Sequence, residues 1–238
     1  RNGRMYLTYT NEGMPIGAFW GYKTDGLIQT QEQLDAVKRA DFQPNAELGD
    51  VLFVDTNGDG KLDASDRCMI GNPIPDVIYG INVGMAWKGF DLNLQFSGTI
   101  GNEIFNAMRW YTYFPNDITN KDRAILNYWT PTNTDTNIPR LTPTDVNDND
   151  RFSDMYVEDG TYLRLKNAQL GYTLPASVTQ KIKLQRVRFY VSGTNLFTIS
   201  GYSGMDPEVG QSSSLSRGID YGIYPQSISF TGGINVTF

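Results

Sequence analysis

The stretch YGINVGMAWKGFDLNLQFSG, residues 79–98, decides the fold because apolar side chains occupy every second position on both sides of a Lys-Gly pair. Before the pair, the alternating side chains are Tyr79, Ile81, Val83, Met85 and Trp87, and after it they are Phe90, Leu92, Leu94 and Phe96. A period of two is that of a β-strand whose two faces meet different surroundings. Two such runs around Lys88-Gly89 predict a tight antiparallel hairpin.

Three further stretches carry the same alternation, so about five strands are expected. Their predicted ranges are residues 79–87, 90–98, 162–174, 186–194 and 227–238. In the third range, Leu163 and Leu165 have the opposite parity to Leu170. A change of phase within one strand predicts a β-bulge, or a change of surroundings, between them.

Composition excludes several classes of protein. The 238 residues include 24 glycines, 14 tyrosines and 12 phenylalanines, a mixture that favours β structure. A formal net charge of −6, with no run of Lys or Arg, argues against a nucleic-acid partner. The absence of His removes His-based triads and the usual zinc sites, and the single Cys68 cannot form an internal disulfide. No apolar stretch approaches the roughly 20 residues of a membrane helix, so a helical membrane protein is not expected.

The connections between the expected strands separate two architectures. A soluble β-sandwich would also produce alternating strands. Here, however, the short links 88–89 and 175–184 take turns with the very long links 99–161 and 195–226. Short periplasmic turns and long extracellular loops are typical of outer-membrane barrels. In a barrel the apolar parity faces lipid, and the parity rich in Asn, Ser, Thr and Gln faces a polar lumen.

The stretch DTNGDGKLDASD, residues 55–66, has the oxygen-rich spacing of a calcium loop around Gly60. The expected Ca²⁺ ligands are Asp55, Asn57, Asp59, the carbonyl of Lys61, Asp63 and Asp66. Asp66 departs from the EF-hand pattern, which has Glu at this position, and neither flank reads as a helix. Calcium would therefore be a structural clasp on an extracellular loop, the alternative being a solvated Asp-Asn-Gly turn without metal.

Other segments predict less. Thr30 and Gln33 have the spacing of a capping box that begins a short helix. The aromatic residues of the longest loop, Trp110, Tyr111, Tyr113 and Phe114, could stack on sugar rings or peptide side chains, or pack on each other. The carboxylate pairs Asp148 with Asp150 and Glu158 with Asp159 could suggest a glycosidase, but spacing along a loop does not set the separation that such chemistry needs. No enzyme activity is expected.

Several long segments together resemble the C-terminal region of SusC-like TonB-dependent outer-membrane transporters. They are GMPIGAFWGYKTDGLIQTQEQL (13–34), the stretch from GDVLFVDTNGDG to GTIGNEIFN (49–106), YLRLKNAQLGYTLP (162–175) and VRFYVSGTNLFTISGYSGMDPEV (187–209), with a terminal Phe238. The resemblance implies a barrel of 22 strands in the outer membrane of a Gram-negative bacterium, filled by an N-terminal plug that contacts TonB. It also implies a SusD-like lipoprotein lid, import of oligosaccharides or oligopeptides, and a terminal aromatic strand, ending at Phe238, that the barrel-assembly machinery reads.

The expected fold class is thus all-β: the C-terminal strands of a large antiparallel transmembrane β-barrel with long extracellular loops. Residues 1–76 are expected to be an extracellular loop region, and residues 77–238 to hold the barrel strands with loops 99–161 and 195–226. The expected partners are the N-terminal remainder with its plug, TonB, the SusD-like lipoprotein, the assembly machinery and outer-membrane lipid. The alternative is a secreted, calcium-stabilised β protein that binds or cleaves glycans.

Overall fold

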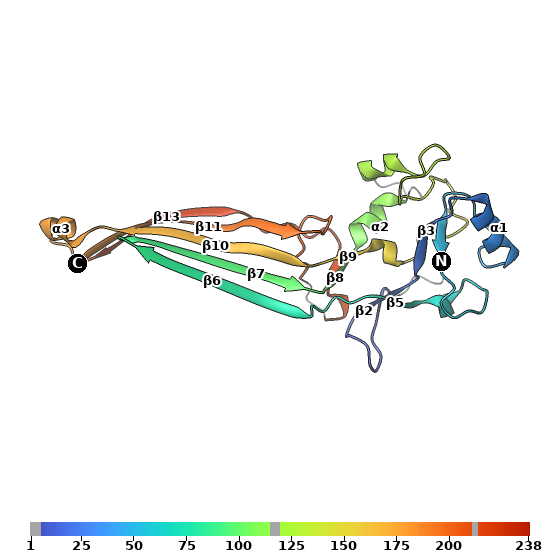
Figure 1. The fold of residues 1–238 in the computed structure, drawn as a ribbon, viewed down its shortest axis with the longest axis horizontal. Coiled ribbons are helices and arrows are strands. Elements are labelled where there is room, and N and C mark those ends of the chain that lie inside the picture. Colours follow the sequence, from blue (N-terminus) through green and yellow to red (C-terminus); the bar gives the residue numbers. More distant parts are fainter. Residues whose placement is uncertain (1–5, 115–119, 211–213) are drawn as a thin grey trace. The chain divides into compact units, whose positions relative to one another are not determined.

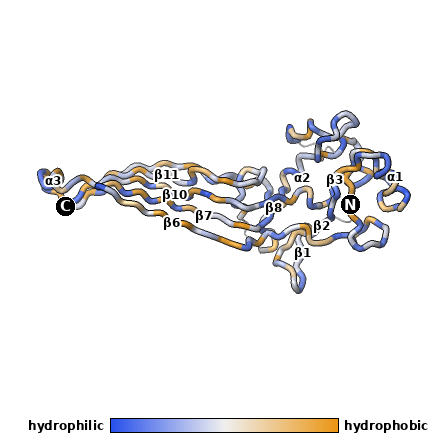
Figure 2. The backbone as a smooth tube through the Cα atoms, in the orientation of Figure 1, coloured by the Kyte–Doolittle hydropathy of each residue, from blue (hydrophilic) through white to orange (hydrophobic). Residues whose placement is uncertain are grey.

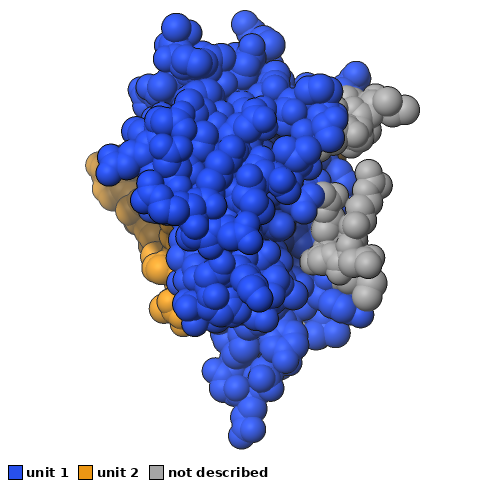
Figure 3. Space-filling view, turned by 90° about the vertical axis from the view of Figure 1, so that its right-hand side faces the viewer, with its two compact units in different colours: residues 1–74, 103–158, 209–223 blue, residues 75–102, 159–208, 224–238 orange. Residues whose placement is uncertain are grey.

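The computed structural model describes residues 6–114, 120–210 and 214–238 and divides the chain into two compact units (Figure 1). The first, here called the loop unit, comprises residues 1–74, 103–158 and 209–223 (Figure 3). The second, the sheet unit, comprises residues 75–102, 159–208 and 224–238. This division differs from the expected split at residue 76, because much of both long connections folds with the N-terminal region around a shared core.

The sheet unit contains the five expected strands in one antiparallel sheet of order β13-β11-β10-β7-β6. The strands are β6 (Val77–Trp87), β7 (Phe90–Ile100), β10 (Tyr162–Thr173), β11 (Arg186–Ser200) and β13 (Ser229–Thr237). At the β6–β7 hairpin, Lys88 and Gly89 have φ angles of 47° and 90°. Two positive φ angles are those of the two-residue turn whose twist matches paired strands, so the predicted hairpin is confirmed.

Hydrophobic and hydrophilic residues are interspersed along the long strands (Figure 2), and the strand pairing sorts them into rows. One row of paired residues across the five strands is Met85, Leu92, Leu170, Val191 and Gly232, and the neighbouring row is Gly84, Asn93, Gln169, Ser192 and Thr231. We call the side carrying the first row the apolar face and the other the polar face. The apolar face is open in this chain, since Val191 is 61% exposed and Met85 56%.

The bulge predicted in the third strand is present. The register of β10 shifts between Leu165 and Asn167 against both of its neighbours. On β11 the irregularity falls at Asn195, whose φ is 52°. Beyond it the ladder continues, with Leu165 opposite Phe197. The expected end of β11 at residue 194 is therefore wrong: the bulge absorbs the change of phase, and the strand runs to Ser200.

The loop unit contains short strands in three small sheets. The first is formed by β1 (Thr8–Tyr9), β2 (Ala18–Gly21) and β5 (Cys68–Gly71), the second by β8 (Glu103–Asn106), β9 (Val157–Asp159) and β12 (Ile219–Asp220), and the third by β3 (Thr24–Leu27) and β4 (Val51–Phe53). β12 pairs with β8 in parallel, with Ile219 opposite Phe105. The long connections are therefore not structureless.

Short helices complete both units. They are α1 (Gln31–Arg39), η1 (Ala64–Asp66), α2 (Ala107–Tyr113), η2 (Arg123–Asn127), η3 (Asp154–Tyr156), α3 (Ala176–Thr179), η4 (Gln180–Ile182) and η5 (Ser214–Ser216). The capping box predicted for α1 is confirmed, because Thr30 and Gln33 exchange side-chain and backbone hydrogen bonds. Among the helices of the described residues, none has the length and hydropathy needed to cross a membrane.

One buried cluster of the loop unit, here called its main core, joins residues from distant segments. It contains Phe19, Ile70, Phe105, Ala107, Tyr156 and Ile219. Phe19, Phe105 and Tyr156 are completely buried. The core of this unit is thus assembled from all three of its segments, which explains why the long connections fold with the N-terminal region rather than separately.

Candidate functional site

The polar face ends in a charged cluster where β10 meets the segment that follows β11. The Arg164 side chain is 3% exposed and lies 2.5 Å from the Asp206 carboxylate and 2.8 Å from that of Glu208. Lys166 Nζ also lies 2.6 Å from Glu208. Asp206 accepts further hydrogen bonds from the backbone N–H groups of Glu208 and Gln226. The cluster therefore fixes this segment to the sheet, and buried pairing of this kind is costly to break on one side only.

Sequence reasoning missed this cluster. Its basic and acidic members are far apart in the sequence: Arg164 and Asp206 are separated by 42 positions. The available signal was the pair Arg164 and Lys166, the two charged side chains of β10.

The oxygen-rich loop of residues 55–66 is held by its own backbone. Asp55 accepts hydrogen bonds from the N–H groups of Gly58 at 2.7 Å and Gly60 at 2.9 Å, and Asp59 accepts one from Lys61 at 2.8 Å. Asp63 accepts one from Ser65 at 2.7 Å. The Gly60 and Gly58 N–H groups lower the pKa of Asp55, and Ser65 lowers the pKa of Asp63, because they stabilise the ionised forms.

Asp66 is the anchor of this loop. Its side chain is completely buried and accepts hydrogen bonds from the N–H groups of Thr56 and Asp63. The Thr56 hydroxyl in turn donates to the Asp66 carbonyl at 2.7 Å. The shorter side chain at this position, which departs from the EF-hand pattern, thus closes the loop upon itself.

The donor chemistry of the loop suits Ca²⁺, which prefers carboxylate, amide and carbonyl oxygen. Within residues 6–114, 120–210 and 214–238, however, no three acidic, Cys or His side chains converge closely enough to hold a metal ion. Asn57 donates to Asp59 at 3.0 Å instead. To coordinate an ion, the Asp59 carboxylate and its neighbours would have to give up these hydrogen bonds.

A buried polar network ties two other loops of the loop unit together. Asn149 accepts a hydrogen bond from the Val51 N–H at 2.8 Å and donates to Asp50 at 3.0 Å. Asp50, which is completely buried, also pairs with Arg140 at 2.6 Å. Gln43 donates to the Val51 carbonyl at 2.9 Å. Because the side chains of Asn149, Asp50 and Gln43 all have hydrogen-bond partners, the network holds the loops together without the cost of an unpaired buried group.

The four aromatic residues proposed as ligand contacts have different surroundings, and they are not equally exposed. Trp110 donates to the Asp150 carbonyl at 2.7 Å and lies 5.1 Å from the Phe152 ring. Trp110 and Phe114 pack against the main core of the loop unit. Tyr113 lies under the Arg109 guanidinium at 5.0 Å. Tyr111 is 48% exposed, which leaves it as the member of the set most accessible to a ligand.

The remaining candidates have clear surroundings. Glu158 accepts hydrogen bonds from Asn106 and Arg109, and Asp148 pairs with Arg151 at 3.4 Å. Asp91, on the polar face of β7, pairs with Arg188 of β11. The terminal Phe238 is 84% exposed in this chain, and its role as an assembly signal stays a prediction.

Comparison with known proteins places this fold in a class. No family model matches the chain. Among solved structures, it resembles the RagAB peptide transporter with a TM-score of 0.71 and 23% sequence identity over 98% of this chain and 24% of that one. The RagAB peptide importer in the open-open state gives a TM-score of 0.69, 24% identity, and coverage of 99% and 25%. These two likenesses show the fold: the antiparallel sheet matches part of the barrel of these transporters.

Sequence relatives define the group more narrowly. The chain is 39% identical over 235 residues to TonB-dependent receptor P3 of Formosa agariphila and 33% identical over 231 residues to receptor P26 of the same bacterium. It is 28% identical over 198 residues to TonB-dependent receptor SusC of Bacteroides thetaiotaomicron. The chain is homologous to TonB-dependent receptors, SusC among them. These alignments cover 83–95% of this chain but only 18–23% of the relatives, so the chain spans about a quarter of their length or less.

Proposed function

We propose that this chain forms part of the wall and outer loops of a TonB-dependent transporter in the outer membrane of a Gram-negative bacterium. The transporter imports oligosaccharides or oligopeptides and works with a SusD-like lipoprotein lid. The names of the relatives support this proposal, because they are receptors and transporters rather than enzymes.

The two-faced sheet is the observation that carries the proposal. Phe230, Ile234 and Val191 expose 78%, 61% and 61% of their surface on the apolar face. Contiguous exposed apolar surface of this kind marks an interaction or membrane surface. Lipid contact would bury it on the outside, whereas Asn93, Gln169 and Ser192 on the polar face would meet water or polar protein groups.

The strand connections support the expected orientation. The short links 88–89 and 175–184 lie at one end of the five strands, and the long links from β7 to β10 and from β11 to β13 lie at the other. In a barrel of this class the end with short links is periplasmic. Residues of the long links would then contribute to the extracellular surface beneath the lid.

The mechanism follows from barrel size. A barrel as wide as the SusC-like class has a lumen that its own wall cannot fill, so it needs a plug. This chain supplies wall, and the N-terminal remainder supplies the plug that TonB displaces. The fixed polar face gives the moving plug a surface of hydrogen-bonding groups, and no bond in the cargo is broken or made.

Calcium on the loop of residues 55–66 is a structural part of this proposal. Asp55, Asp59 and Asp66 would supply oxygen ligands in exchange for the hydrogen bonds that they accept now, and an extracellular position would expose the loop to ambient calcium. The ion would clasp a surface loop and take no part in the transport step.

Cell fractionation tests the membrane assignment, and growth assays test the transport assignment. The protein should fractionate with outer membranes, need detergent for extraction, and co-purify with a lipoprotein partner. Disruption of its gene should abolish growth on one glycan or on peptides while growth on glucose continues. Recovery as a soluble, monodisperse protein without detergent would instead support the secreted calcium-stabilised β protein.

A further inference from the structure

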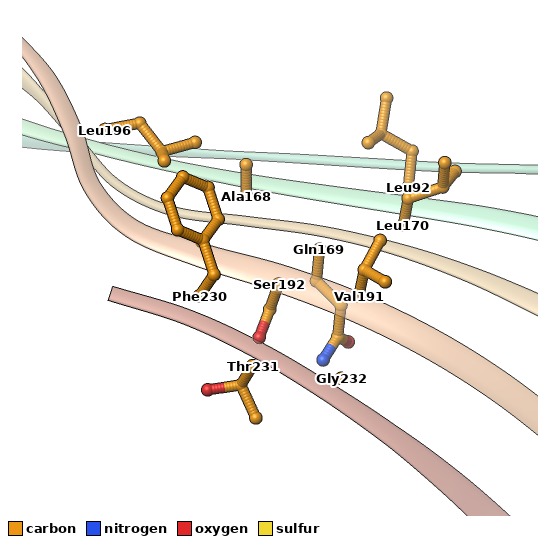
Figure 4. A pocket seen from close by; sticks show the side chains of 11 residues that line it. Leu92, Ala168, Gln169, Leu170, Val191, Ser192, Leu196, Phe230, Thr231 and Gly232 are labelled. Atoms are coloured by element: carbon orange, nitrogen blue, oxygen red, sulfur yellow. The ribbon is translucent and has the colours of Figure 1, made fainter. Parts of the chain in front are cut away.

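A groove of about 390 Å³ crosses the apolar face of the sheet over β7, β10, β11 and β13. Leu92, Leu170 and Val191 form one end, and Leu196 and Phe230 form the other. Figure 4 shows these apolar side chains on one side of the strands, while Gln169, Ser192 and Thr231 extend to the other side. The volume is in the range of sites that hold a small ligand.

The groove exists because small residues interrupt the apolar face. Ala168 of β10 and Gly232 of β13 are small, whereas the next residues on the same face of these strands, Leu170 and Phe230, are large. A Cβ atom added to Gly232 would come no nearer than 3.9 Å to any atom, that atom being the Tyr190 carbonyl oxygen. Crowding therefore does not require glycine at this position. The space above Gly232 is open and could hold a larger side chain or a ligand.

The bulge shapes the other end of the groove. Asn195, with its φ of 52°, turns the strand so that Leu196 lies over Gly193. Leu196 and Phe230 thereby become a raised edge beside Ala168. Without the extra residue, the ladder would continue evenly and this edge would be absent.

We propose that this groove binds one acyl chain of a membrane phospholipid. The groove is continuous with the face that contacts lipid in a barrel of this class, and its walls are aliphatic and aromatic. No lining residue is charged, which favours a zwitterionic phospholipid over a lipid with several phosphate groups, since such headgroups are recognised by clusters of Lys and Arg. This inference rests on the membrane assignment proposed above.

Photocrosslinking in lipid tests the proposal. The full-length protein is placed in phosphatidylethanolamine nanodiscs that contain a phospholipid with a diazirine in its acyl chain, and the labelled peptides are identified by mass spectrometry. We expect at least threefold more label on the strand segments around Leu170, Val191 and Gly232 than on the segment around Val83 and Met85, which belongs to the same face outside the groove.

Two groove variants and one control sharpen the test. Gly232→Phe and, independently, Ala168→Leu should fill the groove and reduce its label to the level of the rest of the face. Val83→Phe adds a similar side chain outside the groove and should leave the groove label unchanged. Label distributed evenly over the face of the unmodified protein would overturn the proposal, even if neither groove variant folds.

Other outcomes are equally informative. Co-purified lipopolysaccharide that protects the groove from the phospholipid probe would replace the proposed occupant. Crosslinks between groove residues and another strand of the same protein would show that its own side chains fill the space, which also overturns the proposal. Failure to enter the nanodisc at all would refute the membrane assignment instead, so the two failures are distinguishable.

Discussion

Asp91 and Arg188 form an ion pair that reaches across an entire strand, over Gly171. The Arg188 guanidinium lies 2.9 and 2.5 Å from the two Asp91 carboxylate oxygens, although Asp91 is on β7 and Arg188 on β11. Gly171 of the intervening β10 is paired with Asp91 on one side and Tyr190 on the other. A Cβ on Gly171 would come 2.5 Å from Asp91, so only glycine leaves room for this contact on the polar face.

Replacing Gly171 by Val should therefore separate Asp91 from Arg188. We expect a loss of about 1–3 kcal/mol, as for other insertions into filled space. The measurement is the temperature at which the folded barrel band is lost in semi-native gels. Gly80→Val is the matched control, because Gly80 is on the same face and its added Cβ meets nothing closer than 3.8 Å. Equal shifts for both variants would contradict the explanation.

The apolar face predicts an asymmetry between two adjacent positions of β13. Ile234→Arg should cost about 2–4 kcal/mol if the side chain lies near the bilayer midplane, while Asn235→Arg should cost less because it extends from the polar face. Unfolding by urea in lipid vesicles measures both. Similar costs at the two positions would invalidate the assigned orientation.

Asn149 should be essential to the buried network of the loop unit. Asn149→Ala leaves the Val51 N–H without its acceptor, an effect worth about 1–3 kcal/mol. Hydrogen exchange of the peptide covering residues 43–53 should quicken. Asp148→Asn removes the charge of a partly exposed ion pair with Arg151 and keeps a residue type that tolerates the φ of 52° at this position, so it should leave exchange nearly unchanged. The proposal for this network is wrong if the two variants behave alike.

Calcium should order the loop of residues 55–66. Asp59→Ala should weaken the ion's effect, because it removes one of the oxygen donors, without preventing membrane assembly. The measurement is protease cleavage within the loop of the detergent-solubilised protein, in calcium and in chelator. Asp25→Ala is a control with an exposed acidic residue outside the loop. Identical cleavage of the unmodified protein in both buffers would eliminate the calcium clasp.

Removal of Phe238 should reduce outer-membrane levels of the protein more than its lost burial explains. The side chain is 84% exposed here, so its packing within this chain contributes little. Quantitative immunoblotting of membrane fractions measures the effect, with Val236→Ala, near the end of β13, as the control. Normal levels of the truncated protein would argue against a terminal assembly signal.

The strands were predictable from sequence because their determinants are local. The alternation from Tyr79 to Phe96 identified β6 and β7, the Lys88-Gly89 pair located their turn, and the parity change after Leu165 indicated the bulge. The length of β11 was not predictable in the same way, since the extra residue at Asn195 resets the pattern and hides its continuation to Ser200.

The interactions that sequence reasoning missed all join distant positions. Asn149 and Val51 are 98 residues apart, and Asp91 and Arg188 are 97 apart. Neither pair has a spacing that marks it, because the partners meet only after the chain has folded. The aromatic run of residues 110–114 was visible in the sequence, but the sequence did not show that Trp110 and Phe114 pack against the main core while Tyr111 stays exposed.

The parallel pairing of Ile219 with Phe105 sets an order of events in folding. The core of the loop unit includes Ile219, and this residue follows β11 in the chain, so four of the five long strands precede it. Contacts between such distant positions carry the highest cost in loop-closure entropy and form slowly. The core of the loop unit therefore cannot be completed before β11 has been synthesised, and the resistance of this core to protease would report that β6, β7, β10 and β11 are already in the chain.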